Sequence, residues 1–201
     1  MDRATFMKDY WRYYILLEKK FIGTLDYVEL AEENFSTYSV EYAHQLLAVG
    51  SELDTFFKIY CGFSLDSRKN IMDYTRYIMS EYPEIKSQSV TICNTAINLL
   101  PYGEWIQWNP QDSKTKNLLS WWDDYNFVKH NRQENITKAS MGNVVKALSA
   151  LYLIEMKYLQ VITKEIQEPD EPENDSNLFA LTNWKFNLTL VDYIWDKATT
   201  T

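Results

Sequence analysis

The chain of 201 residues is 46% hydrophobic and 15% aromatic, has only five glycines and five prolines, and carries a formal net charge of −8. This composition supplies enough apolar material for one large core and favours helix over an all-β or loop-rich fold. The acidic balance disfavours a general duplex-DNA binder, because such proteins neutralise phosphates with a basic face. A local basic patch for a small or single-stranded RNA remains available from Lys114, Lys116, Lys129, Arg132 and Lys138.

Hydrophobic periodicity predicts long helices in the first half of the chain. Over residues 2–30, apolar side chains recur at steps of three and four and share one face: Phe6, Tyr10, Tyr13, Leu17, Phe21, Leu25 and Val28. Residues 40–61 are apolar almost all round, as in a helix buried on several sides. Ser36, Thr37 or Ser39 can cap that helix. A shorter helix is expected over 70–82, ended by Pro83.

The second half is less regular before helix returns. Residues 87–110 predict a long irregular connection, with a possible small hairpin in the strand-like runs 90–92 and 105–108. Helices are expected over 113–134 and 137–164. Six acidic residues and two prolines follow in 165–175. We therefore predict a mainly α fold: a helical bundle over 1–164, an acidic linker or loop over 165–177, and an apolar C-terminal segment over 178–201 that packs on the bundle or on a partner.

Several features of the sequence limit the class of protein. Cys61 and Cys93 show neither a pairing pattern nor metal-ligand spacing. No signal-peptide pattern and no run of about 18 uncharged apolar residues is present, so we expect a cytoplasmic protein without membrane association. Phosphate-binding glycine loops, nucleophile elbows and H-E-x-x-H motifs are absent, and His44 and His130 are the two histidines. We therefore expect no metal and no cofactor.

The side chains with most chemical interest lie between Trp121 and Arg132. On a continuous helix Asn126 and His130 lie side by side, one turn apart, with Lys129 adjoining. An imidazole can take up and release protons near neutral pH, and metal-free RNA cleavage needs a base for the 2′-hydroxyl and donors for the phosphate. Asn126 could orient the ring or contact phosphate, while Lys129 and Arg132 could neutralise charge. The alternative is a structural histidine, satisfied by a buried hydrogen bond.

Two acidic residues on the apolar helix 40–61 also stand out. Glu52 and Asp54 could form a buried acid pair that supports His130 across the core. Alternatively, they pair with Lys58 or a backbone donor and fix the helix register. Glu155 continues an apolar line of the helix 137–164, which favours a partner within the core over a chemical role.

The segment Trp121–Arg132 resembles the Y-N-x-x-K-H-x-R signature of a bacterial group related to the HEPN superfamily. Ser51-Glu52-Leu53-Asp54, with Lys58 four residues on, resembles the second-helix motif of the same group, and length and layout resemble abortive-infection proteins of the AbiV kind. The resemblance covers roughly residues 5–163. It implies a HEPN-like bundle, a homodimer, and antiphage defence that blocks phage growth by interfering with translation through RNA.

One departure from the superfamily leaves two functions open. HEPN ribonucleases typically carry arginine, a polar residue, three further residues and histidine; Asn126 and His130 match, whereas Tyr125 stands in place of the arginine. A phenol provides no permanent positive charge for a phosphate. The first hypothesis is a metal-independent endoribonuclease, a dimer whose two Asn126/His130 clusters face one cleft. The second is a non-catalytic dimeric interaction module, switched by a phage or host regulatory protein. A housekeeping helical protein is the third.

Overall fold

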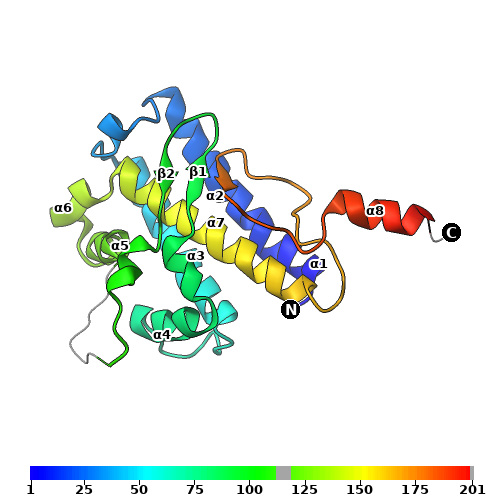
Figure 1. Cartoon of the computed structure of the whole chain (residues 1–201). Coiled ribbons are helices and arrows are strands. Elements are labelled where there is room, and N and C mark those ends of the chain that lie inside the picture. The colour runs from blue at the N-terminus through cyan, green and yellow to red at the C-terminus, as the bar shows by residue number, and fades with distance from the viewer. Residues whose placement is uncertain (112–118, 200–201) are drawn as a thin grey trace.

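The computed structural model describes residues 1–111 and 119–199. Helices make up most of it, so the mainly α fold class is confirmed (Figure 1). The helices are α1 (Arg3–Phe6), α2 (Arg12–Ile22), α3 (Val40–Tyr60), α4 (Ile71–Glu81), α5 (Ser120–His130), α6 (Arg132–Asn135), α7 (Met141–Thr163) and α8 (Leu190–Thr199). The strands are β1 (Val90–Ile92), β2 (Asn98–Leu99) and β3 (Phe179–Leu181). Within the described residues, no helix combines the length and the apolar character needed to cross a membrane.

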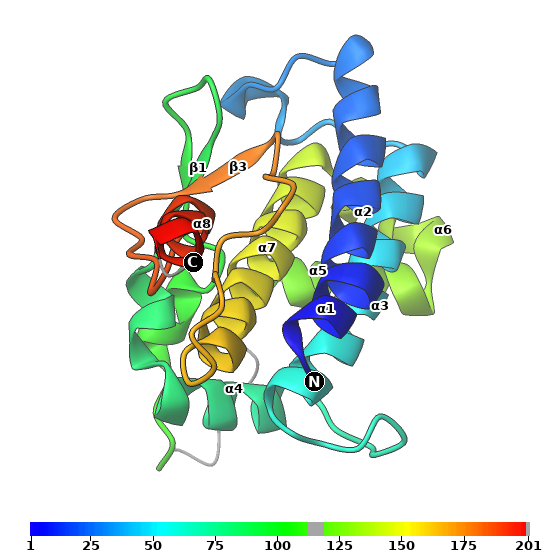
Figure 2. The same cartoon turned by 90° about the vertical axis from the view of Figure 1, so that its right-hand side faces the viewer.

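Helices α3 and α7 form the centre of the bundle, with α2 packed on both and α5 on both from another side (Figure 2). Their sequences explain the position, because both are apolar nearly all round. Each begins at a serine cap: Ser39 Oγ accepts a hydrogen bond from Tyr42 N at 3.0 Å, and Ser140 Oγ accepts one from Asn143 N at 3.3 Å. The caps satisfy backbone N–H groups that would otherwise lack partners.

The N-terminal helical run is shorter than expected and changes its buried face. It continues from α1 through a π-helical turn (Met7–Trp11) into α2 and a 3-10 turn (Gly23–Asp26), whereas the sequence predicted helix to residue 30. The π turn adds a residue to the helical repeat. Consequently Trp11 and Tyr14 are buried, while Tyr13, predicted to be in the core, is 40% exposed.

The expected small hairpin is present as β1 and β2, and β3 extends it to a three-stranded sheet. Val90 pairs with Leu99 of β2 and, on its other side, with Leu181 of β3, both antiparallel. The strand expected at 105–108 is wrong: Gly103–Gln107 forms a 3-10 turn in which Trp105 is buried. The Trp105 ring lies 4.7 Å from the Tyr102 ring, so tertiary packing overrides the local strand preference.

The acidic segment 165–177 is irregular, and side chains of α1, the π turn and α2 bind it to the bundle. Arg3 donates to the carbonyls of Pro169 and Glu171, and Trp11 Nε1 donates to Asn174 O at 2.9 Å. Buried Glu18 accepts hydrogen bonds from the Tyr14 hydroxyl, the Ser176 hydroxyl and Asn177 N. The chain then forms β3 and ends in α8, which projects from the body (Figure 1).

Candidate functional site

Helix α5 carries most of the predicted site and is fixed first at its N-terminus. Glu104 Oε2 accepts a hydrogen bond from Ser120 N at 2.8 Å, which places a carboxylate at the positive end of the helix. Trp121 is buried, and its Nε1 donates to Pro101 O at 2.8 Å. The irregular connection before α5 therefore contributes directly to the helix position.

The middle of α5 is fixed by a close approach to α3. A Cβ added at Gly50 would lie 2.3 Å from Cδ2 of Tyr125, so the phenol ring rests on the bare backbone of α3. Tyr125 is 2% exposed, and Trp122 lies 5.2 Å from it, ring to ring. Sequence reasoning missed Gly50, although a glycine inside a long apolar helix is the signal of such a contact. Tyr125 is therefore a buried residue that packs α5 against α3, and not an exposed residue of the site.

A polar contact also fixes the middle of α5 to the beginning of α7. Asp124 Oδ1 lies 2.5 Å from Lys138 Nζ, and Asp124 Oδ2 accepts a hydrogen bond from Asn143 Nδ2 at 2.9 Å. Asn143 also donates to the Lys138 carbonyl at 2.8 Å. Asp124, which the sequence did not single out, therefore joins α5 to the beginning of α7.

The remaining predicted residues lie on that last turn and just beyond it. Lys129, His130 and Arg132 are exposed, and Asn126 is half-buried. Among residues 1–111 and 119–199, the side chain of His130 forms no hydrogen bond or ion pair. Asn126 Nδ2 donates to Trp122 O at 2.9 Å, one turn back in the same helix. The buried, hydrogen-bonded histidine that was the structural alternative is therefore not what the fold contains.

The helix expected over 113–134 is interrupted. Asn131 has φ −151° and ψ 78°, which ends α5 at His130, and α6 starts at Arg132. The expectation that His130 and Arg132 share one continuous helix was therefore wrong. Asn131 caps α6 with its side chain, and Asn is favoured at caps for this reason. Residues 113–118, where the helix was expected to begin, lie outside the described residues, and with them Lys114 and Lys116.

Glu52 and Asp54 lie on α3 but point to different neighbours. Asp54 Oδ2 lies 3.3 Å from Lys58 Nζ, and Asp54 Oδ1 accepts a hydrogen bond from the Tyr74 hydroxyl at 3.0 Å. Glu52 is half-buried, and burial raises its pKa. Asp54 thus forms the ion pair with Lys58, and among the described residues neither acid forms a hydrogen bond or ion pair with His130.

Glu155 is the least satisfied polar side chain of the bundle. It is 0% exposed on α7, and neither carboxylate oxygen finds a hydrogen-bond donor among the described residues. Burial, and then the negative charge of Glu52, raise its pKa well above the ordinary value for glutamate. The pKa of Tyr10, in the π turn, is raised mainly by burial and also by nearby negative charges, those of Glu52 and Glu155 among them. The two acidic side chains that influence each other are thus Glu52 and Glu155, and not Glu52 and Asp54.

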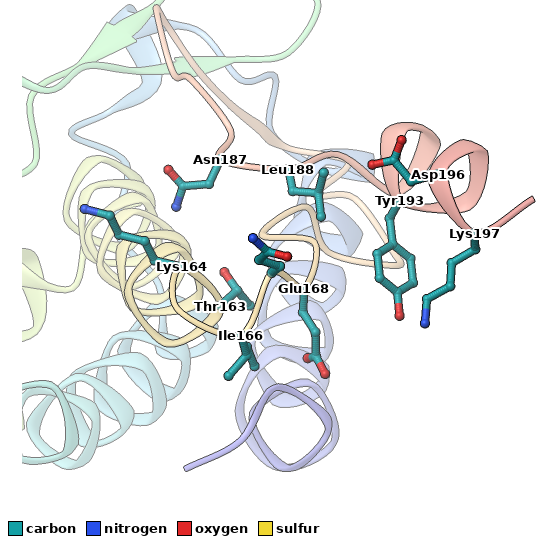
Figure 3. A pocket seen from close by; sticks show the side chains of 10 residues that line it. Thr163, Lys164, Ile166, Glu168, Asn187, Leu188, Tyr193, Asp196 and Lys197 are labelled. Atoms are coloured by element: carbon teal, nitrogen blue, oxygen red, sulfur yellow. The ribbon is translucent and has the colours of Figure 1, made fainter. Parts of the chain in front are cut away.

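Cavities occur away from α5. The largest of three, about 750 Å³, opens between the end of α7 and α8 and includes Thr163, Tyr193 and Lys197 in its wall (Figure 3). Two others have volumes of about 430 and 350 Å³. None of the seven predicted site residues lines these three cavities.

Several side chains at the end of α5 are exposed. Phe127, which the sequence analysis did not select, is 51% exposed, and Lys138 Nζ lies 4.7 Å from its ring centre. Lys129 Nζ lies 5.3 Å from the Tyr125 ring centre. Phe127, Lys129 and His130 are thus exposed around the end of α5, and aromatic rings, cations and imidazoles are groups that contact bases and phosphates. In the described ranges no three His, Cys, Asp or Glu side chains gather as a metal site would require.

Comparison with protein-family models, with curated proteins and with solved structures gave no match to this chain.

Proposed function

We propose that this protein is an antiphage abortive-infection effector whose working surface is the exposed end of α5. The observation that carries the proposal is the exposure of His130 on a helix whose other side is buried and bonded. A histidine kept for stability is expected to have a buried partner. His130 instead stands at the surface beside Lys129 and Arg132, within the segment that resembles the HEPN-related signature.

Binding of single-stranded RNA is the activity that this surface supports best. The half-exposed Phe127 ring offers a stacking surface for a base, and Lys129 and Arg132 offer charge for phosphates. Such binding to translated or transfer RNA would interfere with translation. Cleavage has less support, because the Asn126 amide is bonded to its own helix and the Tyr125 ring is buried against Gly50. Neither side chain is placed to hold a phosphate beside His130.

The second candidate is a non-catalytic dimeric interaction module that a phage or host protein switches. The observation that favours it is the apolar outer side of α8, where Val191 and Ile194 are 74% and 65% exposed. Apolar side chains grouped in this way are typical of protein interfaces. In this version the α5 surface contacts a regulatory protein in place of RNA.

Phage plating combined with RNA assays tests the proposal. Cells that express the protein should plate phage with lower efficiency than cells with an empty vector. Purified protein should bind a single-stranded RNA oligonucleotide, and affinity should fall as salt rises because counterions are released from phosphates. Lys129→Ala/Arg132→Ala should bind about tenfold or more weakly, corresponding to about 1.4 kcal/mol. If wild type and the Lys129→Ala/Arg132→Ala variant bound RNA with the same affinity and the same salt dependence, α5 would be excluded as the RNA surface.

The assays also separate the versions of the proposal. Metal-free cleavage of RNA that His130→Ala abolishes would establish the endoribonuclease. Plating protection that depends on His130 without any RNA binding would favour the interaction module. No protection against any phage tested would argue against a role in defence.

A further inference from the structure

A hollow lies where α2 ends and α3 begins, and none of the residues in its wall belongs to α5. Its volume is about 430 Å³, which falls within the range of about 300–1,000 Å³ usual for small-molecule sites. Gly23, Tyr27 and Val28 line one side, and Tyr42, in the first turn of α3, lines another. We call this space the α2–α3 hollow.

Several polar side chains in the wall of the α2–α3 hollow already have partners within the protein. The Thr24 hydroxyl donates to a backbone carbonyl of α2 at 2.6 Å, and Ser39 Oγ accepts a hydrogen bond from Tyr42 N at 3.0 Å. Glu41 Oε1 accepts one from Gln45 Nε2 at 2.9 Å. These groups stabilise the turn after α2 and the start of α3, so a ligand would meet chiefly the apolar parts of the wall.

Two buried polar atoms at this place lack a partner. Tyr42 is 2% exposed, and its hydroxyl forms no hydrogen bond among the described residues. Gln45, three residues further along α3, is 4% exposed, and its Oε1 has no partner there either. The amide of Gln45 is oriented by its Nε2, which donates to Lys20 O at 3.3 Å and to Glu41 Oε1. Since burying polar groups without partners is unfavourable, these two atoms point to a missing ligand.

The two atoms require different groups from a ligand. The Tyr42 hydroxyl can donate a hydrogen bond, whereas Gln45 Oε1 can only accept one. A ligand that satisfies both must carry an acceptor and an N–H close together, as a cyclic amide does. The wall contains one cation, Lys20, and one carboxylate, Glu41, so its charges favour an uncharged ligand. The aromatic rings of Tyr27 and Tyr42 suit a flat body.

We propose that the α2–α3 hollow binds a small, uncharged, planar cyclic amide, the chemistry that uracil-type bases share with simple lactams. The ligand carbonyl accepts a hydrogen bond from the Tyr42 hydroxyl, the ligand N–H donates to Gln45 Oε1, and the flat body lies against the apolar wall. An apolar hollow with a few polar groups that fix orientation is the usual form of a small-molecule site. The hollow is separate from α5, so this site is independent of RNA binding there.

Ligand-observed NMR titration of the full-length protein, with 2-quinolone and with uridine up to about 5 mM, tests the site and distinguishes a lactam from a nucleoside. Wild type should bind at least one of them saturably. Tyr42→Phe should weaken that binding about five- to tenfold, because one hydrogen bond is lost. The N-methylated form of the same probe, which lacks the N–H, should bind wild type more weakly by a similar factor. Tyr77→Phe, at a 37% exposed tyrosine of α4, is the matched control and should bind as wild type.

Two further variants' properties separate the site from a merely structural tyrosine. Gly23→Phe should abolish binding by filling the hollow, since Gly23 has φ −60° and an added Cβ meets no atom within 4 Å. Without ligand, Tyr42→Phe should melt at or above the wild-type temperature, because the hydroxyl it removes has no partner. Failure of wild type to bind either probe would overturn the proposal, and so would equal binding by Tyr42→Phe or by the N-methylated probe. A lower melting temperature of Tyr42→Phe, with no binding by wild type, would assign the hydroxyl to an enclosed water only.

Discussion

Gly50 sets how closely α5 can approach α3, because its missing side chain leaves room for the Tyr125 ring. This contact also accounts for the tyrosine at position 125 through packing alone. A guanidinium needs hydrogen-bond acceptors on its edge, whereas the Tyr125 site is a flat, buried surface of helix backbone. The identity of residue 125 is thus tied to packing.

Gly50→Ala should destabilise the protein, although alanine ordinarily favours helix over glycine. The new methyl group would overlap the Tyr125 ring at 2.3 Å, and overpacking of this kind costs about 1–3 kcal/mol. Thermal unfolding measures the effect. Gly23→Ala, where the added Cβ meets nothing, is the control and should be neutral or slightly stabilising. Equal melting temperatures for Gly50→Ala and wild type would show that the approach is looser.

Glu155 makes the stability of the bundle depend on pH. The pKa of Glu155 is raised in the folded state. At a pH between the ordinary pKa of glutamate and this raised pKa, the folded protein therefore keeps a proton on Glu155 that the unfolded chain has released. The contribution to stability is therefore fully present below the unfolded pKa and is lost as pH rises through the folded pKa. Glu52, whose pKa burial also raises, adds to the same trend.

Glu155→Gln should remove much of this dependence, because the amide does not ionise. We expect the melting temperature of wild type to fall relative to that of Glu155→Gln as pH rises from about 4.5 upward. Below that pH the difference between the two proteins should be constant. Parallel curves over the whole range from acid to neutral pH would mean that Glu155 has no raised pKa.

At the scale of elements, Asp124 connects α5 to the start of α7 through Lys138 and Asn143. Asp124→Ala should lower the free energy of unfolding by about 1–2 kcal/mol, since two partners lose a charged acceptor that is only partly exposed. It should also increase amide hydrogen exchange in the last turn of α5. Glu134→Ala, at an exposed acid of α6, should change stability by less than about 0.5 kcal/mol. Comparable losses in both variants would contradict a specific role for Asp124.

Hydrophobic periodicity predicted the helices that pack in the centre of the bundle. It failed where a single residue, or a partner distant in the sequence, determines the local structure. The helices expected over 40–61 and 137–164 correspond to α3 and α7, whose apolar patterns are unambiguous. The interruption at Asn131 follows from one backbone conformation inside an otherwise helical sequence. The strand β3 needs a partner, β1, some ninety residues earlier, so no local pattern reveals it. Asn126, Lys129 and His130 share α5 because their local spacing fits a helix, whereas Arg132 falls beyond the break at Asn131.

At the scale of the whole molecule, the C-terminal segment is part of the same body as the bundle. Glu18 holds the end of the acidic segment, just before β3, on α2, because it is 1% exposed and binds Ser176 and Asn177 across more than 150 positions of sequence. The pairing of β3 with β1 adds a second link. We therefore expect a single cooperative unfolding transition in which bundle and tail unfold together.

Glu18→Ala should weaken that connection. Three donors would lose their acceptor, among them the Tyr14 hydroxyl at 2.6 Å, at a cost of about 1–3 kcal/mol. The melting temperature should fall, and limited proteolysis should cut first within 165–181. Glu29→Ala, at an exposed glutamate, provides the comparison. Proteolysis that starts within α3 or α7 would contradict the connection described here.

The most direct test of the α5 surface is the plating efficiency of phage on cells that express wild type, His130→Ala or His44→Ala. Both histidines are exposed, and the side chain of His44 is 64% exposed on α3, so neither change should lower the melting temperature by much. We predict that wild type and His44→Ala protect cells equally and that His130→Ala, at the same expression level and melting temperature, does not. Protection by His130→Ala equal to that of wild type would contradict the assignment of the working surface to α5.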